Sequence, residues 1–278
     1  MSDALDRAVS RAMREAARRA ILPRFTLGRP LSAVFKAVGE LVTEADRESE
    51  AILADRLVGL IPGAGIVGEE AAHHEPMLLD RLAKNTCWII DPLDGTGNFA
   101  KGTGPFGILV ALAQDGIPVA GWILDPLTDR LCSAQQGRGA KIDGVDFTAP
   151  VWGGDVPKVA ITRLFADPIQ RQAVMDMLGH SCTVLDSPRC AADQYPRVAT
   201  GDNDATLFTR TISWDHAAGV VFLNEAGGRA LSQDGKTYRC DQPDAGLLIA
   251  TCARRWDMVA GILAEGGASL AGANVAVE

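Results

Sequence analysis

The chain alternates between apolar patterns typical of helices and of strands. Apolar residues recur at helical spacing from residue 4 to residue 22, which predicts an amphipathic helix that ends near Pro23. A second helix is expected after Thr43, because this residue can cap it while Asp46 stands three residues on, as in a capping box. Two more helical patterns cover residues 168–178 and 217–225.

Strand-like segments lie between these helices. The run GILVALAQDGIPVAGWIL, residues 107–124, predicts two apolar strands joined by a turn at Asp115 and Gly116. Shorter apolar runs predict strands at VAITR, ATLFT and LLIAT, and at a Trp-Ile-Ile triplet that is expected to end on Asp91. Such a mixture favours a layered α/β or α+β domain.

A Gly- and Pro-rich stretch, TAPVWGGDVP at residues 148–157, is the expected seam between two halves. Residues 1–150 would form an N-terminal α+β half with most of the candidate metal ligands. Residues 151–278 would form a C-terminal α/β half with Asp215 and the segment that sets substrate specificity. The two halves are expected to pack as one catalytic unit.

Composition narrows the classes of function. The 278 residues are 47% hydrophobic, which excludes a disordered chain, and the formal net charge of −8 makes nucleic acid an unexpected partner. An anionic substrate would be repelled unless metal ions reversed the local field. The six cysteines form no C-x-x-C pair, so we expect a reduced, cytoplasmic chain. No signal peptide or membrane span is expected.

The chemistry concentrates in WIIDPLDGTGNF, residues 88–99. An apolar strand runs into Asp91, Pro92 stops further ladder hydrogen bonding, and Asp94 with Gly95 makes a turn that can open a helix at Thr96. Two carboxylates are thereby displayed beside backbone N–H groups. This arrangement predicts a place where a divalent cation and a phosphate are held together.

Other acidic residues stand at the mouths of predicted elements. Two magnesium ions need oxygen ligands from distant parts of the chain, and the candidates besides Asp91 and Asp94 are Asp46, Glu69, Glu70 and Asp215. For Asp46 taken alone, a role as a helix cap is as well supported as a catalytic role. The aspartyl-phosphate motif D-x-D-G-T is disfavoured, because Asp91 and Asp94 are three apart with a proline between them, so no covalent intermediate is expected.

Four motifs in order resemble the inositol monophosphatase family: GELVTEAD at 39–46, GEE at 68–70, WIIDPLDGTGNF at 88–99 and WDHAAG at 214–219. The resemblance implies an α+β fold, a layered αβαβα sandwich of the inositol monophosphatase and fructose-bisphosphatase type, commonly a homodimer. It implies Mg²⁺ as cofactor, as two or three ions, and hydrolysis of a small anionic phosphomonoester by in-line attack of a metal-activated water.

The resemblance also implies roles for individual residues. The metal ligands would be Glu70, Asp91, the carbonyl of Leu93, Asp94 and Asp215. The catalytic residues that orient the attacking water would be Asp46, Glu70 and Thr96. The residues that contact the substrate would be Asp94, Gly95, Thr96, Arg189, Cys190, Ala191 and Asp215. The N–H groups of Gly95 and Thr96 would donate to the phosphate oxygens.

This chain departs from the family where the substrate would lie. Arg189-Cys190-Ala191 replaces a Gly-Ser/Thr-Ala stretch, Phe208 replaces a glutamate that accepts a substrate hydroxyl, and Gly97 replaces Thr or Ser. Arg189 would pair either with a second phosphate or carboxylate of the substrate, or with an acid of the protein itself. The substrate therefore stays open among inositol monophosphate, histidinol phosphate, a nucleotide bisphosphate and a sugar bisphosphate.

A second hypothesis from another class is a non-catalytic role, because some family members contact the bacterial transcription machinery. The acidic charge and the absence of a lysine-rich stripe give this hypothesis little support. A complete set of acidic residues would also be superfluous for binding alone.

Overall fold

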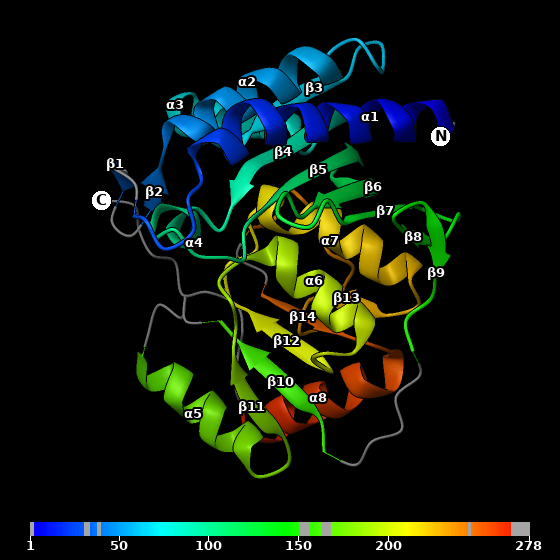
Figure 1. Cartoon of the computed structure of the whole chain (residues 1–278). Helices are drawn as coiled ribbons and strands as arrows, with labels where there is room; N and C mark the ends of the chain where they lie inside the picture. Colours follow the sequence, from blue (N-terminus) through cyan, green and yellow to red (C-terminus); the bar gives the residue numbers. More distant parts are fainter. Residues whose placement is uncertain are drawn as a thin grey trace.

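The computed structural model describes residues 3–30, 34–37, 40–150, 156–162, 168–243 and 246–267. It stacks them in five layers that alternate helix and sheet (Figure 1). The first layer consists of α1 (Asp3–Ala16), a π-helical turn (Ala17–Ile21) and α2 (Glu44–Leu57). The predicted helix over residues 4–22 is thus confirmed, with a change of helical type in its last turn.

The second layer is a seven-stranded sheet in the order β3-β4-β5-β6-β7-β8-β9. Only β3 and β4 run parallel, and the other neighbours are antiparallel. Its strands are β3 (Gly65–Gly68), β4 (Thr86–Asp94), β5 (Gly107–Gln114), β6 (Ile117–Leu124), β7 (Leu131–Gln135), β8 (Ala140–Ile142) and β9 (Val145–Phe147). The predicted hairpin over residues 107–124 is confirmed as β5 and β6.

Two helices, α6 (Ala191–Thr200) and α7 (Ser213–Glu225), form the middle layer. Beneath them lies a five-stranded sheet in the order β11-β10-β12-β14-β13, and α5 (Pro168–Gly179) and α8 (Ala253–Glu265) cover its far face (Figure 1). Its strands are β10 (Lys158–Ile161), β11 (Thr183–Asp186), β12 (Ala205–Phe208), β13 (Arg229–Leu231) and β14 (Leu247–Ala250). The strands predicted at VAITR, ATLFT and LLIAT are β10, β12 and β14.

Short elements complete the described chain: a hairpin of β1 (Val34–Ala37) and β2 (Glu40–Val42), α3 (Glu69–His74), α4 (Thr96–Ala100) and 3₁₀ turns at Leu22–Arg24 and Pro76–Arg81. The predicted seam at 148–157 joins the two sheets, but residues 151–155 within it lie outside the described part. None of the described helices is long and apolar enough to cross a bilayer. All six cysteines are free thiols.

Strands β4 to β7 of the seven-stranded sheet are buried on both faces, which explains their nearly continuous apolar sequences. Along β5, Ile108 and Val110 pack toward α1 and α2, while Leu109 and Ala111 pack toward α6 and α7. Successive side chains of a strand point to opposite faces, so one apolar run serves two cores.

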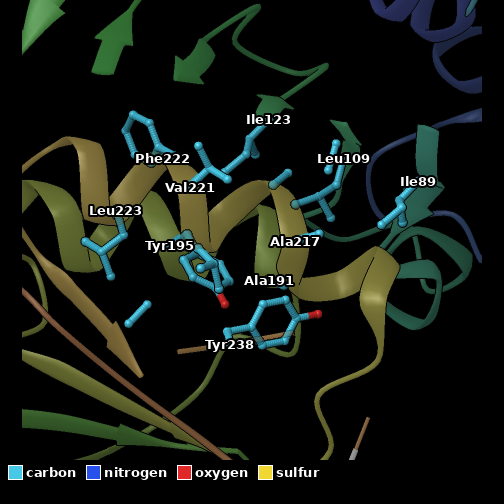
Figure 2. Close-up of a cluster of buried hydrophobic side chains, with 14 of the residues drawn as sticks. Ile89, Leu109, Ile123, Ala191, Tyr195, Ala217, Val221, Phe222, Leu223 and Tyr238 are labelled. Carbon is cyan, nitrogen blue, oxygen red and sulfur yellow. The ribbon is translucent and has the colours of Figure 1, made fainter. Parts of the chain in front are cut away.

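The middle layer is held tightly against both sheets. The Tyr195 ring of α6 is fully buried beside α7, among side chains that come from both helices and from the first sheet (Figure 2). Gly219 of α7 leaves room for this ring, because a Cβ atom there would clash with the ring carbons. Close contact between α6 and α7 therefore depends on this glycine.

Two matched Gly→Ala changes test this contact. Gly219→Ala should lower the free energy of unfolding by about 1–3 kcal/mol, because overpacking against the Tyr195 ring outweighs the better helix propensity of alanine. Gly261→Ala in α8 should raise it by about 0.5–1 kcal/mol, since a Cβ atom there meets nothing within 4 Å. Equal stability of both variants in chemical denaturation would contradict the packing described here.

Candidate active site

The cleft lies where the seven-stranded sheet ends against the middle helices. Strand β4 does not end at Asp91, as the sequence pattern suggested, but continues to Asp94 after an irregularity in its pairing with β5. Pro92 has no N–H to donate to the ladder, and the N–H of Leu93 donates instead to Asp91 Oδ1 at 3.1 Å. The irregularity brings both aspartates to the wall of one cleft.

Gly95 makes the sharp turn that follows. Its φ of +82° favours glycine, and a Cβ atom there would lie 2.9 Å from the carbonyl oxygen of Pro105. Helix α4 begins at Thr96 directly after this turn. The prediction of a glycine turn that opens a helix is therefore confirmed.

Asp46 lies behind Thr96 and belongs to a capping box at the start of α2, as predicted. Its Oδ2 accepts from the N–H and the hydroxyl of Thr43 at 2.8 and 2.5 Å, and its Oδ1 lies 3.1 Å from Thr96 Oγ1. Thr96 Oγ1 also lies 2.9 Å from the carbonyl oxygen of Leu93. Burial raises the pKa of Asp46 to about 6, against the lowering effect of the Thr43 hydrogen bonds. The cap and the link to Thr96 thus coexist in one side chain.

The two glutamates of GEE lie in different places. Glu69 lines the cleft, whereas Glu70 is buried and is not among the residues of the cleft wall. In the parallel pairing of β3 and β4, Gly68 lies opposite Ile90, so Glu69 stands at the level of Asp91. The structure therefore favours Glu69 over Glu70 as the acid of this segment that faces the cleft.

Glu50 of α2 fixes this segment from behind. Its carboxylate accepts hydrogen bonds from the backbone N–H groups of Glu70 and Ala71 at 2.7 and 2.9 Å. Glu50 is itself buried, and burial raises its pKa. The first turn of α3, which carries Glu69, is thus held to α2 by a residue that the sequence reasoning did not single out.

The start of α6 closes the opposite wall. The N–H of Ala192 donates to Asp94 Oδ2 at 2.6 Å, and the Cys190 thiol lies 3.9 Å from the carbonyl oxygen of Asp94. Burial is the main reason that the pKa of Asp94 is raised to about 6 and that of Cys190 well above its usual value. Arg189, Cys190 and Ala191 line the cleft, as predicted for substrate contacts.

Asp215 reaches the cleft from the first turn of α7. The next residue, His216, is buried, and burial lowers its pKa to about 3, so its ring is neutral. Its Nε2 lies 3.1 Å from the carbonyl oxygen of Arg210, which can only accept, so Nε2 carries the proton and Nδ1 accepts from Tyr195 Oη at 3.0 Å. His216 thereby connects α6, α7 and the loop before α7.

The acids of the cleft repel one another. Burial and the charges of Glu69, Asp94 and Asp215 raise the pKa of Asp91 well above its usual value. No group of three or more described acidic, histidine or cysteine side chains is arranged as a ready-made ligand set for one ion. The donor set still suits a divalent cation, because it consists of hard oxygen ligands whose repulsion a cation would offset.

Comparison with known proteins agrees with this geometry. The model of the inositol monophosphatase family matches residues 4–265. The chain belongs to this family. It is 33% identical over 203 residues to the inositol-1-monophosphatase of Bacillus subtilis strain 168, a match that covers 72% of this chain and 75% of the relative.

Family relatives carry other names as well. The chain is 31% identical over 212 residues to the 3'(2'),5'-bisphosphate nucleotidase CysQ of Escherichia coli K12, covering 75% of this chain and 82% of the relative. It is 30% identical over 213 residues to the Nus factor SuhB of Pasteurella multocida, a match that covers 74% of this chain and 76% of the relative. A solved Thermotoga maritima IMPase matches with a TM-score of 0.78 at 23% identity over 96% of this chain and 98% of that one. The expected α+β sandwich is therefore confirmed.

The pH dependence of stability tests the repulsion among the acids. Because the pKa of Asp94 is about 6 in the folded protein and 3.8 in the reference state, the folded state binds its proton more tightly. The contribution of this group to stability is therefore present near pH 4 and lost as the pH rises through about 6. Metal-free Asp94→Asn should be more stable than the unmodified protein at pH 7, and the gap should close toward pH 4.

Thermal unfolding in a chelating buffer from pH 4 to 7 measures this gap. Asp234→Asn serves as the control, because Asp234 forms an exposed ion pair with Lys236, which lowers the pKa of Asp234 to about 2. This control should gain nothing at pH 7. A loss of stability in Asp94→Asn that is equal at pH 4 and pH 7 would refute the account.

Proposed function

We propose that the protein hydrolyses a small anionic phosphomonoester with Mg²⁺, through direct attack by water and without a covalent intermediate. The observation that supports this most is the convergence of Glu69, Asp91, Asp94 and Asp215 on one cleft beside the Gly95 turn. These acids come from α3, β4 and α7, so three separate elements contribute to one oxygen-rich site.

Glu69, Asp91, Asp94, Asp215 and the carbonyl of Leu93 are the proposed metal ligands, with Glu69 in place of Glu70. Bound Mg²⁺, as two or three ions, would supply positive charge that lowers the pKa of a water molecule and stabilises a leaving oxygen. The protein's part is to hold the acids in place: Asp94 through the N–H of Ala192 and Asp91 through the N–H of Leu93.

Thr96 and Asp46 are the proposed residues that orient the attacking water. The hydroxyl of Thr96 lies within hydrogen-bond distance of both Asp46 and Leu93 and has one proton to donate, so its lone pairs stay available to a water. Asp46, with its pKa raised to about 6, can hold or release a proton near neutral pH. The N–H groups of Gly95 and Thr96 are the proposed seat of the phosphate oxygens.

We further propose that residues 1–150 and 151–278 work as one catalytic unit, because the cleft takes Asp91 from the first part and Asp215 from the second. The homodimer and the cytoplasmic location stay predictions that rest on the family resemblance and on the cysteine content. The relatives' names support inositol monophosphate and nucleotide bisphosphates among the candidate substrates, beside histidinol phosphate and a sugar bisphosphate.

Matched glutamine variants of the GEE segment test the metal assignment. Glu69→Gln and Asp94→Asn should each lower Mg²⁺-dependent phosphate release by about 100-fold or more, because a metal ion contributes several kcal/mol to the transition state. Glu70→Gln should retain most of the activity. The assay measures phosphate release from inositol 1-phosphate, histidinol phosphate, adenosine 3′,5′-bisphosphate and fructose 1,6-bisphosphate with and without Mg²⁺. Full activity of Asp94→Asn would sink the proposal.

A second candidate function is a binding role in transcription, favoured by the relative named Nus factor SuhB. A pull-down with the unmodified protein and with Asp94→Asn separates the two functions. Capture of RNA polymerase or ribosomal proteins by both proteins equally would favour the binding role. Absence of such partners together with Mg²⁺-dependent turnover would leave the enzyme alone.

A further inference from the structure

The backbone of Arg189 is in an uncommon conformation. Among the described residues other than glycine, positive φ angles occur at Asn85, Asp115, Asp129, Asp143 and Arg189. The first four are Asn or Asp, whose short polar side chains tolerate the left-handed region. Arg189, at φ +60°, is the member of this set that has no such reason to be there.

A glycine at this position would remove the strain, since glycine adopts positive φ at no steric cost. This chain instead keeps a long cationic side chain at a position where it disfavours folding. Strain of this kind persists where the side chain serves a function.

The surrounding contacts hold Arg189 in a fixed place beside the proposed phosphate seat. Asn98 Nδ2 donates to the carbonyl oxygen of Pro188 at 3.0 Å and to that of Pro105 at 2.8 Å, which ties the segment before Arg189 to α4. On its other side, Cys190 packs so closely on Gly95 that a Cβ atom there would lie 3.3 Å from Cys190 Cβ. Arg189 is thus anchored on both sides to the turn that begins α4.

The guanidinium group of Arg189 is available to a ligand. The residue is exposed and lines the cleft, and within the described ranges no carboxylate pairs with it. Two neighbouring arginines do have partners: Arg171 pairs with Asp186, and Arg197 pairs with Asp193. The alternative role of Arg189, an ion pair with an acid of the protein itself, is therefore not supported within the described residues.

Three other residues that line the cleft favour an anionic ligand over a polyol. Lys101 and Arg210 add two more cationic side chains to the cleft, and Phe208 offers no acceptor for a hydroxyl group. A planar guanidinium group binds phosphate or carboxylate oxygens through two parallel hydrogen bonds.

We propose that Arg189 is a specificity-determining residue that binds a second anionic group of the substrate, a phosphate or a carboxylate, while the first phosphate lies at the Gly95 turn. The substrate class is then a phosphomonoester with a second anion, and not a neutral polyol phosphate. This inference rests on the proposed function, because it concerns the substrate of the same cleft.

Two pairs of compounds that differ in the second anion test the inference. Adenosine 3′,5′-bisphosphate is compared with adenosine 3′-monophosphate, and 2-phosphoglycerate with glycerol 2-phosphate. The unmodified protein should prefer the doubly anionic member of at least one pair by about 10- to 100-fold in kcat/KM, mainly through KM. The pair that responds tells whether the second anion is a phosphate or a carboxylate.

Arg189→Gly should reduce this preference to about one while its Tm stays equal or rises by up to about 3 °C, because the backbone strain is relieved. Arg189→Lys keeps the charge without the planar fork and should retain an intermediate preference. Asn85→Gly, at another positive φ but in the turn before β4, should leave the preference unchanged.

The outcomes separate the two levels of the proposal. Equal turnover of both members of each pair, or a preference that survives in Arg189→Gly, would overturn the inference while the phosphatase stands. A Tm several degrees lower in Arg189→Gly would assign Arg189 a structural role and also overturn it. No Mg²⁺-dependent turnover of any of the four compounds or of the wider substrate panel would overturn the proposed function and the inference with it.

Discussion

Repulsion among carboxylates at one edge of the seven-stranded sheet is the constraint on which the rest of the structure depends. Asp91 is buried beside Glu69, Asp94 and Asp215, and these neighbours add to the cost of its charge. Buried like charges destabilise a fold unless a cation or strong hydrogen bonds offset them. The surrounding elements are arranged so that these acids stay together.

Each acid is held by backbone that is itself fixed elsewhere. The parallel register of β3 and β4 brings Glu69 level with Asp91, and Glu50 holds the start of α3 from behind. The first turn of α6 binds Asp94, and close packing of Tyr195 on Gly219 holds α6 against α7, which carries Asp215. The geometry of the site therefore depends on the helix–helix contact of the middle layer.

Local sequence patterns were enough to predict several of the elements that surround the site. The capping box of Thr43 and Asp46 and the hairpin of β5 and β6 depend on residues close in the chain, and both were predicted. The choice between Glu69 and Glu70 depends on the register between β3 and β4, which no local pattern contains. The continuation of β4 past Asp91 depends likewise on its pairing with β5.

Arg189 could be singled out from the sequence as a departure from the family. Its positive φ could not, because no sequence pattern marks such a backbone at an arginine. The contacts on either side of it, from Asn98 to Pro188 and from Gly95 to Cys190, also join residues about ninety positions apart. The same holds for the buried link from Tyr195 through His216 to Arg210. Tertiary contacts of this kind decide where a side chain points, and sequence patterns record them poorly.

Anomalous diffraction from crystals grown with Mn²⁺ tests the central claim most directly, because Mn²⁺ takes the same oxygen ligands as Mg²⁺. We expect peaks between Asp91 and its neighbours Glu69, Asp94 and Asp215, beside the Gly95 turn. A cleft without peaks in crystals that bind Mn²⁺ elsewhere, or a peak coordinated by Glu70 in place of Glu69, would contradict it.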